Sequence, residues 1–380
     1  MSSRGCVVMW AMPRFYEFFA GGGMARAGLG EEWECLFAND NDAKKAASYA
    51  ANWGGGHLKV ADVGTLTAAD LPGRADLAWA SFPCQDLSLA GAGAGLKGKR
   101  SGTLWPFWRL MQALAAEGRA PSLVVLENVC GALTSHGGED FAAIGSALAG
   151  GGYRFGAVVM DAVRFLPQSR PRLFIVGVDR NRTIPESVVA ASPNPLWHPS
   201  RLAGAQPKAK GLWWKLPEPP PRAATLGDLI EDNPRGVVWH SAAETRRLLA
   251  LMSPLHRRKV ETAKAAGRRT AGALYKRTRT DESGRSMQRA EIRFDGVSGC
   301  LRTPAGGSSR QSILVVEGRE VRSRLLSPRE AARLMGLPDG YKLPGNYNEA
   351  YHLAGDGVAV PVVRFLAEHL LEPLLAGTIQ

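Results

Sequence analysis

Short apolar runs alternate with stretches of helical periodicity over about the first 180 residues of the chain. The apolar runs predict strands over Phe15–Ala20, Glu34–Asn39, Asp76–Phe82, Leu123–Glu127, Gly156–Asp161 and Leu173–Val178. The stretches between them predict helices over Asp42–Trp53, Leu104–Ala116 and Asp140–Gly150. Strands and helices that alternate at this spacing are typical of βαβ units. We therefore expect an α/β domain over residues 1–182, with a mostly parallel sheet that helices cover on both faces.

The pattern changes after this domain. Residues 181–240 hold ten of the 24 prolines, and a segment so rich in proline cannot supply a regular central sheet. We predict a smaller, irregular domain over 183–320 and a segment over 321–380 that returns to the first domain. In that last segment, Ser327-Pro328-Arg329-Glu330 indicates a helix start, and Val360–Leu371 is amphipathic.

The net charge of +12 is concentrated in one part of the predicted smaller domain. Residues 246–293 hold fourteen Lys and Arg against four Asp and Glu, an excess of ten. A solvated surface can carry such charge. The alternative is a nucleic-acid partner, because each phosphate that a cation neutralises releases counterions.

Cysteine use and hydropathy exclude several classes of protein. The five cysteines form no Cys-x-x-Cys pair, and their odd number argues against a disulfide framework and against a structural metal site. No run approaches the roughly 18 apolar residues of a membrane span, and the first residues lack the apolar stretch of a signal peptide. We expect a cytoplasmic protein with no membrane contact and no bound metal.

Glycine and acidic residues follow the first three predicted strands. Phe18-Phe19-Ala20-Gly21-Gly22-Gly23 ends the first strand and opens a helix, where glycines allow a ligand to approach the backbone. Asp40 ends the second strand, where Rossmann-like folds place an acid on ribose hydroxyls. Asp62 follows a third candidate strand and could accept an adenine amino group. Either aspartate also suits a helix cap or a turn. Together these strand ends favour a ribose-adenine cofactor, and composition leaves NAD and S-adenosyl-L-methionine open.

A cysteine and a glutamate follow two further strands. Cys84 lies in Ser81-Phe82-Pro83-Cys84-Gln85, and Glu127 follows the apolar run Leu123–Leu126. Both would meet at the edge of the sheet where ligands bind. A buried carboxyl group is costly unless it is paired or functional. A thiolate that adds to C6 of cytosine, with acid assistance at N3, makes C5 nucleophilic, and this chemistry uses both groups.

Two further features support that chemistry. Arg170 and Arg172 precede the strand Leu173–Val178, where guanidinium groups could favour the thiolate and hold the cytosine O2. The loop after Cys84 is rich in glycine and carries Lys97, Lys99 and Arg100, which suggests a lid over a polyanion.

Taken together, these motifs resemble the DNA cytosine-C5 methyltransferase family, in the family's order and over nearly the whole chain. The matching segments are Phe19–Gly23 for the cofactor motif, Pro83-Cys84-Gln85 for the nucleophile, Glu127-Asn128-Val129 for the glutamate, Gln168–Arg172 for Gln-x-Arg-x-Arg, Leu326–Gly336 for the late motif and Gly355–Val358 for the closing motif.

The resemblance implies a Rossmann-like methyltransferase sheet, S-adenosyl-L-methionine as cofactor and a target-recognition domain over 183–320. It implies that Cys84 is the nucleophile, Glu127 the acid at N3, and Arg172, with Arg170 beside it, a substrate contact. The residues that it places around the cofactor are Phe19, Ala20, Gly21, Gly23, Asp40, Asn41, Asp62, Val63, Pro83, Leu104, Asp356 and Val358.

Two positions depart from the family pattern, and some alternatives stay open. Asp356 stands where Asn is usual, so an acceptor remains but the amide donors are lost. Asp40 stands where the longer Glu is usual. The expected activity is methylation of C5 of a flipped cytosine in a specific sequence of double-stranded DNA. The alternative is a tRNA cytosine-C5 methyltransferase, because such relatives share the motifs.

The basic segment favours duplex DNA as the substrate. A non-catalytic DNA-binding protein on the same scaffold is disfavoured because Cys84, Glu127 and Arg172 are all present. We expect a monomer. The resemblance leaves open the target sequence and the existence of a restriction endonuclease partner.

Overall fold

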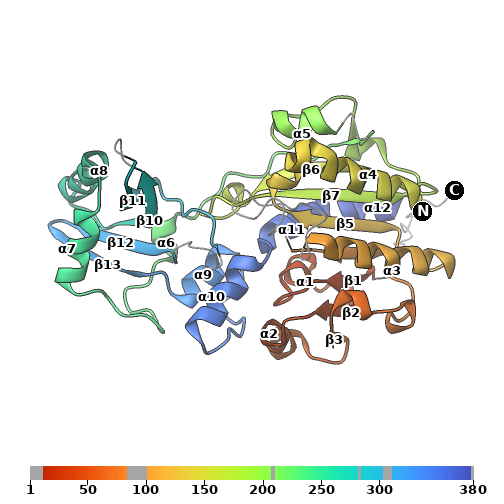
Figure 1. Cartoon of the computed structure of the whole chain (residues 1–380), viewed down its shortest axis with the longest axis horizontal. Helices are drawn as coiled ribbons and strands as arrows, with labels where there is room; N and C mark the ends of the chain where they lie inside the picture. Colours follow the sequence, from red (N-terminus) through yellow and green to blue (C-terminus); the bar gives the residue numbers. More distant parts are fainter. Residues whose placement is uncertain (1–11, 84–100, 207–209, 281–283, 303–309, 378–380) are drawn as a thin grey trace, which may run out of the picture.

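The computed structural model of the chain describes residues 12–83, 101–206, 210–280, 284–302 and 310–377. Figure 1 shows a larger part built around one wide sheet and a smaller part built around a second sheet. Within the described residues, no helix is long and apolar enough to cross a membrane.

The wide sheet has seven strands in the order β3-β2-β1-β4-β5-β7-β6. They are β1 (Arg14–Phe18), β2 (Glu34–Asp40), β3 (Leu58–Val60), β4 (Leu77–Ala80), β5 (Leu123–Asn128), β6 (Tyr153–Asp161) and β7 (Pro171–Asp179). β1 to β5 run parallel, whereas β7 is antiparallel to both β5 and β6. The predicted mostly parallel α/β sheet is confirmed.

Both faces of this sheet are buried. On one face, alternate residues such as Phe15, Leu77 and Val125 belong to one hydrophobic cluster, which α1 (Met24–Leu29) and α11 (Val360–Leu366) cover. On the other face, Tyr16 and Leu126 belong to a second cluster with α3 (Leu104–Ala116) and α4 (Glu139–Gly150). Strands buried on both sides need apolar residues at every position, which is why the sequence shows them as continuous runs.

The end of the chain returns to this sheet. α11 lies against α1, and a Cβ on Gly28 would lie 2.4 Å from the Cβ of Val363, so this close approach requires glycine. A π-helical turn (Ala367–Leu371) and α12 (Glu372–Ala376) continue α11. The predicted amphipathic helix at Val360–Leu371 therefore exists, with its second half wound more widely.

The proline-rich segment covers the outer edge of the large sheet. It contains β8 (Val189–Ala190), β9 (Trp213–Trp214) and α5 (Ser200–Ala205). The Val159 amide of β6 donates to the Trp197 carbonyl at 2.8 Å, and the Trp197 side chain is fully buried. The predicted domain boundary at residue 183 stays a proposal, and this packing favours a boundary after β9.

The smaller part contains an antiparallel sheet in the order β11-β10-β12-β13. Its strands are β10 (Thr270–Thr280), β11 (Ser286–Arg293), β12 (Ser312–Glu317) and β13 (Glu320–Leu325), and its helices are α6 (Leu226–Leu229), α7 (Ala242–Ala250) and α8 (Pro254–Ala265). The prediction of an irregular domain did not include this sheet. The outer halves of β10 (residues 276–280) and β11 (residues 286–289) bear mostly polar or charged side chains on both faces, so the sequence there shows no apolar alternation. The predicted boundary between residues 320 and 321 falls inside β13, so we propose to place it after this strand.

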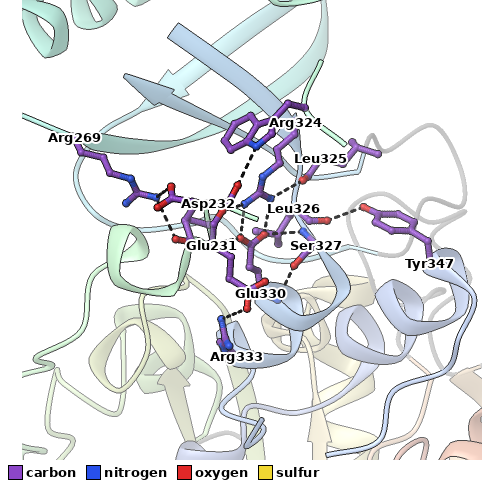
Figure 2. Close-up of polar contacts among 12 residues, drawn as sticks. Glu231, Asp232, Arg269, Arg324, Leu325, Leu326, Ser327, Glu330, Arg333 and Tyr347 are labelled. Carbon is purple, nitrogen blue, oxygen red and sulfur yellow. Dashed lines mark hydrogen bonds and ion pairs between the residues drawn. The ribbon is translucent and has the colours of Figure 1, made fainter. Parts of the chain in front are cut away.

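A buried ion pair joins the two parts (Figure 2). Arg324 of β13 makes two bonds to Glu330 of α9 (Pro328–Leu334), at 2.6 and 2.8 Å, and neither side chain is exposed. The Arg324 guanidinium also donates to the Glu231 carbonyl at 2.6 Å. Ser327 caps α9 in a capping box with Glu330, which confirms the helix start predicted from the sequence. α10 (Tyr347–Asp356) follows.

We expect the Glu330→Gln substitution to lower the free energy of unfolding by about 3 kcal/mol or more, because it leaves the Arg324 charge buried without its counterion. The matched control is Asp295→Asn, which breaks the exposed pair with Arg293 and should cost at most about 1 kcal/mol. Urea denaturation of both variants measures the difference. Equal, small losses would show that the buried pair does not hold the two parts together.

Candidate active site

The carboxyl ends of four parallel strands line up along one edge of the large sheet. The register pairs Phe18 of β1 with Asn39 of β2 and with Ala80 of β4, and pairs Ala80 with Leu126 of β5. The residues that follow these positions therefore share the same edge. They are the glycine turn, Asp40, the segment leading to Cys84, and Glu127.

The glycine turn is shaped to admit a ligand. Phe19 has a positive φ of 55°, as do Gly21 (56°) and Gly23 (76°). A Cβ on Gly21 would meet no heavy atom within 4 Å, so the backbone there borders open space. By contrast, the Gly22 carbonyl is held by the hydroxyl of Tyr341 at 2.7 Å and the indole N–H of Trp53 at 3.0 Å. The turn is fixed on one side and open on the other.

Asp40 supports this turn from the end of β2. Its carboxylate accepts the Gly21 amide at 2.8 Å and the Asp42 amide at 2.8 Å. Burial raises the pKa of Asp40, and these amide bonds oppose the rise. A carboxylate accepts up to about four hydrogen bonds, so Asp40 also suits ribose hydroxyls. Asn41, beside it, is exposed.

The other predicted cofactor residues lie around the same turn. Asp62 is exposed and accepts the Gly64 amide at 2.7 Å, so it caps the short helix Val63–Thr65. Asp356 ends α10 and bonds the Lys45 ammonium of α2 (Ala43–Trp53) at 2.7 Å. The side chains of Val63, Leu104 and Val358 are buried.

The fit to an adenosine-type cofactor rests on the open backbone at Gly21. A Cβ on Gly357, in the closing motif, would lie 2.1 Å from the Met24 sulfur, so this motif lies against the helix that the glycine turn opens. The Asp40 carboxylate therefore lies beside a glycine backbone that borders open space. This arrangement suits ribose hydroxyls and an adenine amino group.

Glu127 and Arg172 form an ion pair at the same edge. Glu127, in β5, is 7% exposed, and its Oε1 lies 3.3 Å from Nε of Arg172. Arg172 reaches it because β7 runs antiparallel to β5 and starts beside the end of that strand. Glu127 and Arg172 are 45 positions apart in the sequence, and the sheet brings them together.

Asn128 connects the glutamate to the segment that leads to Cys84. Its side-chain amide donates to the Phe82 carbonyl at 3.0 Å, and its oxygen accepts the Val129 amide at 2.8 Å. Phe82 is buried, and Pro83 directly precedes Cys84. Cys84 and the glycine-rich loop after it lie outside the described residues. The described segment that ends at Pro83 is therefore held at Phe82 by the residue after Glu127.

Arg170 makes different contacts from Arg172. It is 2% exposed, and its guanidinium donates to the carbonyls of Gly355 (2.8 Å), Gly357 (2.6 Å) and Leu301 (3.1 Å). These bonds join the closing motif and the segment after β11 to the start of β7. The arrangement supports a positioning role for Arg170 and leaves Arg172 as the arginine that contacts Glu127.

Two residues at this edge had no role assigned from the sequence. Gln168 is fully buried, donates to the Leu334 carbonyl at 2.6 Å and accepts the Leu301 amide at 3.0 Å. Cys300 has its sulfur 3.2 Å from Nη1 of Arg170. Burial opposes ionisation of this thiol, but the charges of Arg170 and Arg172 outweigh it and lower the pKa of Cys300. The sequence offered a signal for Gln168, because this residue begins the Gln-x-Arg-x-Arg motif. The sequence around Cys300 offered no such signal.

Comparisons with known proteins cover almost the whole chain. The family model described as C-5 cytosine-specific DNA methylase matches residues 13–372. Type II methyltransferase M.NlaX of Neisseria lactamica is 28% identical over 369 residues, which cover 96% of this chain and 98% of that protein. Type II methyltransferase M.NgoBI of Neisseria gonorrhoeae is 29% identical, with 93% and 91% covered.

Solved structures agree in fold. The S. pombe Dnmt2 methyltransferase matches with a TM-score of 0.57 at 18% identity, covering 95% of this chain and 99% of that one. The Entamoeba histolytica methyltransferase EhMeth gives a TM-score of 0.64 at 12% identity, with 96% and 99% covered.

Proposed function

Because the chain belongs to the C-5 cytosine-specific DNA methylase family and so methylates C5 of cytosine in DNA with S-adenosyl-L-methionine, we propose how it does so. The proposal is that Cys84 bonds covalently to C6 of a cytosine flipped out of a specific sequence in double-stranded DNA. The observation that carries it is the Glu127–Arg172 pair beside the segment leading to Cys84, with Asn128 linking the two.

The chemistry follows from what C5 of cytosine lacks. C5 is a poor nucleophile until the C5=C6 bond is polarised. The Cys84 thiolate forms a bond to C6 while Glu127 donates a proton to N3, and the electron pair of the double bond makes C5 an enamine carbon. When bound, S-adenosyl-L-methionine supplies the electrophilic methyl group that C5 attacks. A base then removes the C5 proton, the C6–sulfur bond breaks to release the Cys84 thiolate, N3 returns its proton to Glu127, and the C5=C6 double bond is restored.

Glu127 and Arg172 have separate roles in these steps. Glu127 must carry or share a proton as N3 is engaged. Its burial at the end of β5 excludes water that would compete for that proton. Arg172 fixes the carboxyl through its Nε contact. A guanidinium is a fork of donors, and it suits the cytosine O2 on the same side of the base.

The cofactor is assigned to the glycine turn by the same reasoning. In this proposal, Phe19 lies beside the adenine, Asp40 binds the ribose hydroxyls and Asp62 accepts the adenine amino group. Asp356 lies in the closing motif, at the position where the family pattern has Asn. Its carboxylate bonds the Lys45 ammonium. Arg170 positions that motif through the Gly355 and Gly357 carbonyls.

The target base must leave the duplex for this chemistry. A stacked and paired cytosine does not expose C5 and C6 to a thiolate on one side and a methyl donor on the other. Extrusion costs about a few kcal/mol for unstacking and unpairing. Several relatives are named Type II methyltransferases, which supports modification of one short sequence. Such an enzyme could be paired with a restriction endonuclease that cuts the same sequence.

Expression in a host that lacks cytosine methylation tests the function. Bisulfite sequencing of genomic DNA should show 5-methylcytosine at one short, recurring sequence, with none in the host carrying an empty vector. RNA from the same cells is converted and sequenced in parallel. Methylation that appears in tRNA and not in DNA would contradict the proposal in favour of the tRNA alternative.

A further inference from the structure

The hairpin formed by β10 and β11 extends beyond the rest of the small sheet. β12 pairs with β10 only from Thr270 to Leu274. Beyond that point β10 pairs with β11 alone, from Tyr275 opposite Glu291 to Thr280 opposite Ser286. Residues 276–280 of β10 are all exposed. A two-stranded β-ribbon therefore projects from the sheet, and such a ribbon fits the major groove of B-form DNA.

The two faces of this ribbon differ in chemistry. Alternation along the paired strands places Tyr275, Arg277, Arg279, Met287, Arg289 and Glu291 on one face, which we name the arginine face. Lys276, Thr278 and Gln288 lie on the opposite face, which has no arginine among the paired residues and continues the residues buried beneath α8. In Figure 1, α8 lies on the side of the small sheet that is away from the large sheet. The arginine face therefore opens on the side toward the large sheet.

The arginine face is connected to the active site through one short segment. The Gly299 amide donates to the hydroxyl of Tyr275, and a Cβ on Gly299 would lie 2.3 Å from that oxygen. The next two residues, Cys300 and Leu301, contact the Arg170 guanidinium. A duplex whose flipped cytosine lies beside Glu127 and Arg172 therefore places its neighbouring base pairs next to this face.

Glu291 orients two of the arginines. Its Oε2 lies 3.2 Å from Nε of Arg277, and its Oε1 lies 2.7 Å from Nε of Arg279. The Arg277 guanidinium also lies over the Tyr275 ring, 5.5 Å from its centre. Both arginine side chains remain about half exposed, at 51% and 52%. They are thus held in direction and still open to a partner.

The carboxylate between these arginines distinguishes two possible ligands. A phosphate is attracted by net positive charge, and Glu291 offsets one of the three charges of Arg277, Arg279 and Arg289 on this face. A guanine edge offers the O6 and N7 acceptors. Recognition of these two atoms depends more on the direction in which the guanidinium is held than on net charge. The geometry therefore favours a base edge over the sugar–phosphate backbone.

Resting on the proposed function, we propose that Arg277 and Arg279 determine the target sequence by donating to guanine edges in the major groove beside the flipped cytosine. Glu291 is the positioning residue for both arginines. The exposed cations of α8, Arg257, Arg258 and Lys259, lie on the other face of the small sheet and do not read bases.

Charge-preserving substitutions test this assignment. Arg277→Lys and Arg279→Lys keep the charge but lose the fork that matches guanine. Each should lower the preference for the cognate site over a site changed at one base pair by about 10-fold or more. Arg258→Lys on α8 is the matched control and should keep the wild-type preference. Competition between two duplexes in one methylation reaction measures the preference, and bisulfite sequencing maps any new sites.

A second variant tests the role of Glu291. Glu291→Gln removes the charge that orients the arginines, so binding to non-cognate duplex should strengthen and its salt dependence should steepen, while the sequence preference falls. Wild-type preference in both lysine variants and in Glu291→Gln, with methylation retained, would overturn the assignment of the arginines. The proposed function would then still stand. Absence of DNA methylation by the wild-type protein would overturn the proposed function and this assignment with it.

Discussion

Replacing Cys84 with serine should lower the rate of methyl transfer by about 10⁴-fold or more, the scale seen when a covalent nucleophile is removed. The reason is the acidity of the two groups, because a thiol ionises near neutral pH beside cations and a hydroxyl does not. Single-turnover transfer of a labelled methyl group to cognate duplex measures the loss. Binding of DNA and of S-adenosyl-L-methionine should remain, since neither needs the sulfur.

Cys300→Ser is the matched control for this result. The Cys300 sulfur lies beside Arg170, and the pKa of its thiol is lowered, so it is the described cysteine best prepared to act as a nucleophile. Cys300 takes part in no step of the proposed reaction, so the variant should keep most of its turnover. A loss in Cys300→Ser equal to that in Cys84→Ser would contradict the assignment of Cys84.

Glu127→Gln should lower kcat by about 10²- to 10⁴-fold, the range for removing a positioned general acid. The amide occupies the same space but cannot transfer a proton to N3, and it removes the counterion of Arg172. Steady-state kinetics on the cognate duplex should show the fall mainly in kcat. The control is Glu368→Gln, which breaks the surface pair with Arg364 on the far side of the large sheet from α3 and α4. A loss below tenfold in Glu127→Gln would exclude Glu127 as the acid.

The large sheet could be predicted from the sequence because its strands are buried on both faces. Short continuous apolar runs such as Leu123–Leu126, repeated between helix-like stretches, are typical of strands buried on both faces. The small sheet could not be predicted in the same way. Its longest strand, β10, is apolar only where β12 covers it, and beyond Leu274 it carries exposed Lys, Arg and Thr. Such a strand can be recognised only when its pairing with β11 is known.

The candidate site shows the same division. Glu127 could be identified because a carboxyl group directly after a buried apolar run is costly unless it is paired or functional. The different contacts of Arg170 and Arg172 could not be inferred, because the carbonyls that hold Arg170 belong to Leu301, Gly355 and Gly357, more than a hundred residues along the chain. Two arginines spaced by one proline look alike in sequence, and only the packed structure separates them.

Trapping the covalent intermediate tests whether Cys84 is the nucleophile. Duplex DNA with 5-fluorocytosine at the target cytosine is incubated with the protein and S-adenosyl-L-methionine. Fluorine at C5 cannot leave as a proton, so the C6–sulfur bond persists after methyl transfer. We expect a denaturation-resistant adduct that maps to the peptide containing Cys84 and is absent in Cys84→Ser. An adduct of equal yield in Cys84→Ser, or one that maps to Cys300, would contradict this assignment.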